Sequence, residues 1–334
     1  MKMATLHDVA RESGVSIATI SNVFTKKKYV SLETKQKILE ICRKLDYKPD
    51  PIAASMITKK TGIIGLFLDT KKDVFHVIYS YLIKGVGMEA AHIGYSPLMF
   101  FNISEKEDLS KLFSKKTAFI EGAIILAPHG GDFRIKELLK DNIPLVVIGN
   151  PPEDIDADIP YLDSPNEQDT YTLTSHLLSK GHRRIAFLNS PKSMTVGKDR
   201  LKGFMRAFKE YAAEPDRNLM FEISSHEEAY GVLNKINASF TACMVESDNS
   251  AREVYKFAAD KNLEIGVNFA VVSLGGLREE FMPSLTSIYV DFEEVGINAV
   301  RLLKNVFDKN ISSKFIEDKS YITIGASSDF IFEE

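Results

Sequence analysis

Two patterns of hydrophobic positions divide the chain near residue 60. Up to that point, apolar residues recur at the three- and four-residue spacing of one face of an α-helix. Beyond it, short apolar runs alternate with longer helical stretches, which is typical of parallel strands covered on both faces by helices. The pattern predicts an all-α head followed by a larger α/β body.

Three helices are predicted in the head, each with a capping residue. Thr5 caps the first, and Asp8 stands three residues on, near the unpaired amides of the first turn. Gly14 falls where a helix end needs a left-handed residue. Ser16 caps the second helix and Ser31 begins the third. Two helices joined by a short turn that contains glycine are the unit that places its second helix in the major groove of DNA.

The second helix is predicted to run from Ile17 to about Phe24. Ile20 and Val23 are expected to point into the head. The side chains that remain on the outer face are Ile17, Ala18, Ser21 and Asn22.

Nine strands are predicted in the body from short apolar runs. They are too many for one compact sheet, so we expect two similar halves, each a doubly wound parallel sheet, with a cleft between them. Ligands of such folds lie at the carboxyl ends of the strands, which would face this cleft. The predicted strands are 62–68, 96–101, 122–127, 144–149, 184–189, 242–246, 269–274, 286–290 and 320–326.

Charge separates the same two regions. The first 60 residues hold 12 Lys and Arg against 6 Asp and Glu, whereas the remaining residues hold 30 against 40. A basic head on an acidic body suits a head that neutralises phosphates and a body that avoids them. The alternative, a three-helix bundle that binds no nucleic acid, fits the charge less well.

Composition narrows the class of protein further. At 334 residues the chain has room for two or three domains. Met1 and Lys2 lead into an amphipathic helix rather than an apolar stretch, so we expect no export signal, and no apolar run approaches the ~20 residues of a membrane span. Cys42 and Cys243 are expected to be small buried side chains in a reducing cytoplasm.

The sequence resembles the lactose-repressor (LacI/GalR) family of bacterial transcriptional regulators over essentially its whole length. The specific segments are DVARESGVSIATIS, YVSLETKQKILEICRKLDYKPDPIAASM and GHRRIAFL. Other segments agree with the family but would also fit many α/β proteins: TGIIGLFL, EGAIILAP, IPLVVIGN, DRLKGFMRAF and PSLTSIYVDFEEVG.

The resemblance implies a domain division. Residues 1–48 would be the helix-turn-helix DNA-binding domain, 49–60 the hinge, and 61–334 a periplasmic-binding-protein-like body for effector binding and dimerisation. Within the body, the chain would cross between halves near Tyr161, Val290 and Tyr321. The N-subdomain would then be about 61–161 plus 291–320, and the C-subdomain about 162–290 plus 321–334.

The resemblance also implies DNA contacts. Ile17, Ala18 and Asn22 would face base edges in the major groove. Asn22 stands where Arg is frequent in the family, and because Asn prefers adenine whereas Arg prefers guanine, we expect a departure in the operator at that base. The positions expected near the phosphates or elsewhere on the DNA surface are Thr5, Ser16, Thr19, Ser21, Tyr29 and Ser31.

The hinge is a separate expectation. Pro49 and Pro51 hold the chain extended before AASMI, a segment too short to form a stable helix alone. The resemblance implies that this helix folds on the operator beside that of its dimer mate and inserts Met56 into the minor groove, where Leu is usual. A plain interdomain linker is the alternative.

The effector pocket is less well defined. Arg200 matches the family residue that anchors a hydroxyl or carboxylate of the ligand, and Ser247 and Asp248 stand at the family's Asn-Asp. At Gly275 the usual sugar-binding Asp is missing. A sugar or sugar derivative remains the expected class. The segment that replaces the family's SNPFF motif adds four candidates: Asp73, Phe75, His76 and Tyr79.

No catalytic motif is found, so we expect a regulator and not an enzyme, with neither cofactor nor metal. Gly85, Gly87 and Ala90 match GxGxxA but lie inside a helical stretch, which indicates helix packing. His182 is expected to be structural. The expected partners are operator DNA, a sugar-like small molecule and a second copy of the chain, with no membrane.

Two alternatives remain open. The first is the same regulator controlled by a partner protein. The second is a solute-binding protein, which should carry an export signal and lack a DNA-binding head. A sugar-processing enzyme would need a carboxylate cluster or cofactor loop that the sequence does not show.

Overall fold

The computed structural model describes residues 4–25, 28–47, 61–68, 77–101, 119–156, 158–276, 280–310 and 314–332. The chain forms two compact units. The first is Met1–Ile63 with Phe119–Glu121, and the second is Ile64–Ala118 with Gly122–Glu334. The predicted hinge, with Met56, and the candidates Asp73, Phe75 and His76 lie outside the described residues.

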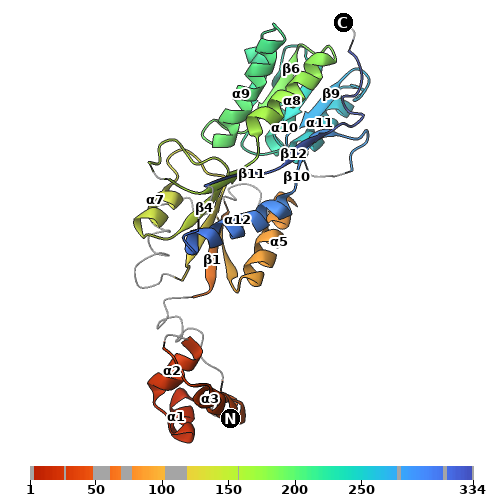
Figure 1. The fold of residues 1–334 in the computed structure, drawn as a ribbon. Coiled ribbons are helices and arrows are strands. Elements are labelled where there is room, and N and C mark those ends of the chain that lie inside the picture. Colours follow the sequence, from red (N-terminus) through yellow and green to blue (C-terminus); the bar gives the residue numbers. More distant parts are fainter. Residues whose placement is uncertain are drawn as a thin grey trace. The chain divides into compact units, whose positions relative to one another are not determined.

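The head consists of α1 (Leu6–Ser13), α2 (Ile17–Thr25) and α3 (Leu32–Lys44) (Figure 1). Five buried side chains form its core, with at least one from each helix: Val9, Ile20, Val23, Ile38 and Cys42. The prediction that Ile20 and Val23 of α2 point inward is therefore confirmed.

The body holds two six-stranded sheets. The first has the spatial order β11 (Phe315–Glu317), β5 (Tyr161–Asp163), β4 (Leu145–Ile148), β3 (Gly122–Leu126), β1 (Ile63–Leu68) and β2 (Ser96–Phe101). The second has the order β12 (Ser320–Thr323), β10 (Thr286–Val290), β9 (Ala270–Ser273), β8 (Ala242–Val245), β6 (Ile185–Asn189) and β7 (Met220–Glu222).

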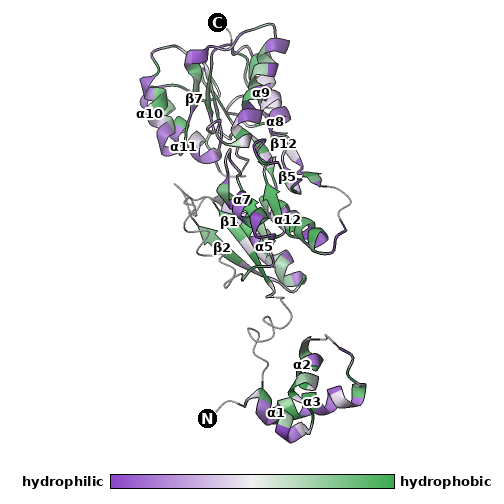
Figure 2. Ribbon diagram, turned by 90° about the vertical axis from the view of Figure 1, so that its left-hand side faces the viewer, coloured by the Kyte–Doolittle hydropathy of each residue, from purple (hydrophilic) through white to green (hydrophobic). Residues whose placement is uncertain are grey.

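Helices cover both sheets. Those on the first sheet are α5 (Val77–His92), α7 (Phe133–Lys140) and α12 (Phe292–Phe307). Those on the second are α8 (Asn166–Ser179), α9 (Thr195–Glu210), α10 (Glu227–Lys235) and α11 (Asp248–Asp260), with a 3-10 turn at Arg217–Leu219. The central strands β3, β4, β6, β8 and β9 are almost wholly buried, as expected for strands packed on both faces. Coloured by hydropathy, the strands of the body are mostly hydrophobic, whereas the helices also carry hydrophilic residues (Figure 2).

All nine predicted strands are present, and the two-sheet α/β body is confirmed. Two details differ. Three further strands of three residues each, β5, β7 and β11, have no apolar run long enough to indicate them. In addition, β12 runs antiparallel to β10, so the second sheet is not wholly parallel.

Helices α5 and α12 approach each other closely at two glycines. A β-carbon on Gly85 would overlap the carbonyl oxygen of Glu293, and one on Gly296 would overlap that of Leu82. The GxGxxA match thus lies within a helix and serves packing at Gly85, as predicted. Gly87 is open, with nothing within 4 Å of such a β-carbon.

The remaining structural expectations concern three buried residues. His182, between α8 and β6, is fully buried and its Nδ1 lies 3.0 Å from Thr241 Oγ1. Cys42 and Cys243 are buried and unpaired, as expected. Within the described residues, no helix is long and apolar enough to cross a membrane.

Candidate functional site

Each helix of the head begins at a capped N-terminus. The Thr5 amide donates to Asp8 Oδ2 at 3.0 Å and the Asp8 amide donates to Thr5 Oγ1 at 3.3 Å, which is a reciprocal capping box. The Thr19 amide donates to Ser16 Oγ at 3.1 Å, and Ser31 caps α3. Capped helix N-termini carry partial positive charge, so these ends can approach phosphates.

The outer face of α2 is small and mixed in polarity. Ala18 is exposed, whereas Ile17, Ser21 and Asn22 are half-buried. This face offers apolar contact at Ile17 and Ala18 and one amide at Asn22. It is therefore suited to base edges that present a methyl group or an adenine.

Two large side chains near the start of α3 are solvent-exposed. Tyr29 is 92% exposed and Leu32 is 71% exposed. Tyr29 was a predicted DNA contact, and Leu32 was not considered from the sequence. Both face solvent beside the Ser31 cap, where they can pack against a partner surface.

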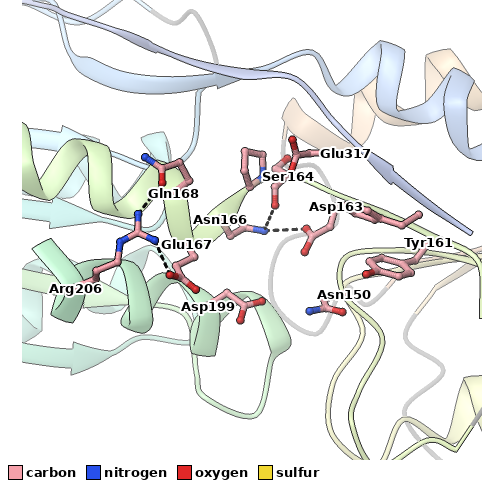
Figure 3. Close-up of a pocket in the computed structure, with 12 residues that line it drawn as sticks. Asn150, Tyr161, Asp163, Ser164, Asn166, Glu167, Gln168, Asp199, Arg206 and Glu317 are labelled. Carbon is pink, nitrogen blue, oxygen red and sulfur yellow. Dashed lines mark hydrogen bonds and ion pairs between the residues drawn. The ribbon is translucent and has the colours of Figure 1, made fainter. Parts of the chain in front are cut away.

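The body contains two adjoining hollows lined from both sheets. The outer one, about 350 Å³, is shown in Figure 3. Asn150 and Tyr161 lie on its first-sheet side, and Glu167, Asp199 and Arg206 on its second-sheet side. Arg206 Nη1 donates to Glu167 Oε1 at 2.8 Å, so this guanidinium is already paired.

The inner hollow is a cavity of about 170 Å³ that shares three residues with the outer one. It lies at the carboxyl ends of β3, β4, β5, β9 and β10, and is lined by the first turns of α9 and α12. Its apolar wall is formed by Leu126, Pro128, Ile148, Val196, Leu274, Val290, Phe292 and Val295. Its charged residues are Asp163, Asp169, Arg200 and Asp318. This is where open α/β sheets bind ligands.

Of the predicted effector residues, Arg200 lines the inner cavity. Its Nη1 donates to the Glu246 carbonyl at 3.2 Å and its Nη2 donates to the Leu274 carbonyl at 3.4 Å. The Nε of Arg200 and Oε2 of Glu246 find no hydrogen-bond partner among the described residues. Burial lowers the pKa of the Arg200 guanidinium, although the charge of Glu246 opposes this.

Three other predicted effector residues, Ser247, Asp248 and Gly275, lie together at the start of α11. Ser247 caps α11, since the Ser250 amide donates to its Oγ at 3.3 Å. Asp248 is buried at the first position of α11, and a β-carbon on Gly275 would contact Ser247 and Asp248. None of these three lines either hollow. Tyr79 is half-buried in α5 against the body core.

The structure adds acidic residues that the sequence analysis missed. Burial, together with the charge of Asp199, raises the pKa of Asp163 to about 7. Burial raises the pKa values of Asp169 and Asp318 to about 6 each. Burial also raises the pKa of Glu246 above its ordinary value. The position of Asp163 at the end of a strand was the available clue, but β5 was not recognised.

Two family models match the chain. Residues 5–50 match the model of bacterial regulatory proteins of the lacI family. Residues 174–328 match the periplasmic binding protein-like domain. The first covers the three-helix head, and the second covers all six strands of the second sheet.

The chain is similar to several transcriptional regulators over nearly their full length. The ribose operon repressor of Halalkalibacterium halodurans is 28% identical, over 92% of this chain and 91% of its own. The transcriptional repressor PurR of Mannheimia succiniciproducens is 28% identical, over 94% and 96%. Catabolite control protein A of Streptococcus mutans is 28% identical, over 91% and 92%.

Solved structures share the fold. A lac repressor dimer bound to operator and the anti-inducer ONPF gives a TM-score of 0.78 at 22% identity, covering 98% of this chain and 99% of that one. The regulator CelR in complex with cellobiose gives 0.73 at 21% identity, covering 97% and 99%.

Proposed function

We propose that this chain, which belongs to the LacI family of bacterial regulatory proteins, is a sequence-specific DNA-binding repressor whose operator affinity is set by a small molecule in the inner cavity. The observation that carries the proposal is the pairing of a capped helix-turn-helix head with a cleft lined from two sheets. Such a protein acts by binding and not by catalysis, in the cytoplasm where bacterial DNA lies.

DNA recognition is assigned to the head. Ile17, Ala18 and Asn22 of α2 read base edges. Thr5, Ser16, Thr19, Ser21 and Ser31 position the head on the phosphates, and Tyr29 contacts the DNA elsewhere. The capped N-termini of α1, α2 and α3 support this assignment, because anionic oxygens are favoured there. Residues 1–48 would be the DNA-binding domain and 49–60 the hinge that carries Met56.

Effector binding is assigned to the body, residues 61–334. Arg200 provides the main polar anchor, with Ser247, Asp248 and Gly275 shaping the backbone that holds it. Asp73, Phe75 and His76 remain proposed ligand contacts on the resemblance alone, and Tyr79, which lines neither hollow, would act only indirectly. A ligand between the halves would change the separation of the hinges in a homodimer, and so the fit of two heads to a near-palindromic operator.

Selection of binding sites from random duplexes, followed by fluorescence anisotropy, tests the DNA role. The expected result is one near-palindromic sequence, bound at least ~10³-fold more tightly than random duplex and weakened steeply between about 50 and 200 mM salt. Binding with equal affinity to every duplex would contradict the proposal.

A further inference from the structure

Three carboxylates reach the inner cavity from three separate segments. Asp163 ends β5, Asp169 lies in the first turns of α8, and Asp318 follows β11. All three segments lie close to points where the chain passes between the two sheets. The architecture therefore gathers negative charge at one place, although the residues are far apart in the sequence.

The carboxylates are incompletely satisfied by the protein. Asp163 accepts hydrogen bonds from Asn166 Nδ2 at 2.8 Å and from the Ser164 amide, and Asp169 accepts one from Ser320 Oγ at 2.7 Å. Asp318 is only 7% exposed, and no hydrogen bond to its carboxylate is found among the described residues. Because Asp318 lines the cavity, its carboxylate can accept a hydrogen bond from a ligand there, and the buried Nε of Arg200, which also lines the cavity, has no partner among the described residues.

Positive charge in the cavity is limited. Arg200 is the one cation among the described residues that line it. Its Nη atoms donate to the main-chain carbonyls of Glu246 and Leu274, and the carboxyl of Glu246 lies close enough to influence its pKa. The cavity therefore keeps an excess of carboxylates over cations.

Resting on the proposed function, we propose that the effector is a small organic cation, a protonated amine that also carries hydroxyl groups. The ammonium would lie between Asp318 and Asp163, which are close enough for their charges to interact. The hydroxyl groups would meet Arg200, Asp169 and Asn166. A phosphate or carboxylate ligand would add negative charge to an acidic, partly dry site.

A metal ion is a poor occupant of the same cavity. No group of three or more His, Cys, Asp or Glu in the described part of the chain is arranged to hold one. The apolar side chains on the cavity wall, among them Phe292 and Val295, instead suit a ligand with a carbon skeleton.

The raised pKa values of the three carboxyls give the inference a pH signature. Near pH 6 they hold part of their protons, and a bound ammonium favours their ionised forms. Binding should then release protons, and affinity should rise between about pH 5.5 and 7. Asp163 is influenced by the charges of Asp199 and Asp318 and by hydrogen bonds from the Ser164 amide and Asn166. Asp169 is influenced by Ser320, Arg200 and Glu317, and Asp318 by Glu294.

The test uses the full chain and a panel of probes in matched sets. Hexosamines and the amino alcohols ethanolamine and serinol are compared with the corresponding neutral sugars, diols and triols, and with hexose phosphates. Thermal shift identifies any member that stabilises the protein, and titration calorimetry in buffers of different ionisation enthalpy counts the protons exchanged. At least one amine is expected to bind, with proton release and with tighter binding at the higher pH.

Matched variants locate the effect. Asp318→Asn should weaken amine binding about tenfold or more, because it removes a charged partner without changing the shape of the site. Asp156→Asn makes the same charge change at an exposed residue that lines neither hollow, and should leave binding unchanged. Asp169→Asn provides a second cavity variant if Asp318→Asn fails to fold.

Three results would overturn the inference: no stabilisation by any amine, stabilisation by neutral or phosphorylated members alone, or equal effects of Asp318→Asn and Asp156→Asn. Operator anisotropy on the same preparation separates this from the proposed function. A chain that binds its operator but no amine keeps its regulatory role and loses the cationic effector. A chain that binds an amine but no operator keeps the cationic ligand and loses the proposed regulatory role.

Discussion

Gly85 of α5 lies so close to the Glu293 carbonyl oxygen of α12 that a β-carbon could not fit between the two helices. Gly87, two residues on, has open space around the same position. Substitutions at these two glycines therefore distinguish the effect of helix packing from the effect of backbone flexibility. Gly85→Ala should destabilise the body by about 1–3 kcal/mol through overpacking.

Gly87→Ala is the matched control for that prediction. It should be neutral or stabilising by roughly 0.5–1 kcal/mol, because alanine is favoured over glycine within a helix. Thermal or urea unfolding of both variants measures the two effects. Equal destabilisation by the two substitutions would contradict the packing interpretation.

The base preference of the operator should follow the residue at position 22. Asn22→Arg is expected to shift the preferred base from adenine to guanine, with discrimination of about 1–3 kcal/mol. Anisotropy on duplexes that differ at single base pairs measures the shift. A selected site that already carried guanine opposite Asn22 would contradict the assignment.

Ser31→Ala should instead weaken binding to all duplexes by a similar factor, since Ser31 caps α3 and is proposed to lie near phosphate.

Stability should depend on the protonation of His182. Burial lowers the pKa of this imidazole to about 4, with smaller effects from the charges of His176 and Arg183. The unfolded chain, with an ordinary His pKa near 6.5, binds this proton first, so stability falls as the pH drops below about 6.5.

Between about pH 7 and 5, the His182 contribution to the free energy of unfolding should fall by about 2 kcal/mol. His182→Asn keeps a polar side chain near Thr241 but cannot titrate, so this component should be missing from its pH profile. Urea unfolding at both pH values compares the two proteins. Parallel profiles would show that His182 is not buried in its neutral form.

Arg200 should couple the effector to the operator without touching DNA. Arg200→Lys keeps a positive charge beside Glu246, but an ammonium cannot reproduce the planar guanidinium that donates to the carbonyls of both Glu246 and Leu274. Effector affinity is expected to fall about tenfold or more, while operator affinity without effector stays unchanged. Anisotropy with and without effector measures both quantities. Loss of operator binding in the variant would indicate a structural role instead.

Much of the fold follows from local chemistry. The cap residues Thr5, Ser16 and Ser31 act over three residues, so their spacing in the sequence is sufficient to indicate the helices of the head. The buried strands are short apolar runs, and each was recognisable because both faces of the strand are covered.

The missed features depend on the three-dimensional arrangement. The strands β5 and β11 have three residues each and pair with each other. They are strands because of this pairing, which a short local sequence pattern does not indicate. Asp163 and Asp318 end or follow these two strands, and Asp169 stands in the polar stretch NEQDTYT that reads as a solvated helix face. Their convergence on one cavity appears only when both crossings between sheets are in place.

Linkage between effector and operator is the decisive measurement for the proposed function. Operator affinity is measured with and without a saturating effector, and effector affinity with and without operator. The expected result is the same factor in both directions, about 5- to 150-fold, because coupling between two sites is reciprocal. Tight operator binding that no small molecule changes would contradict an effector in the cleft and would favour a partner protein instead.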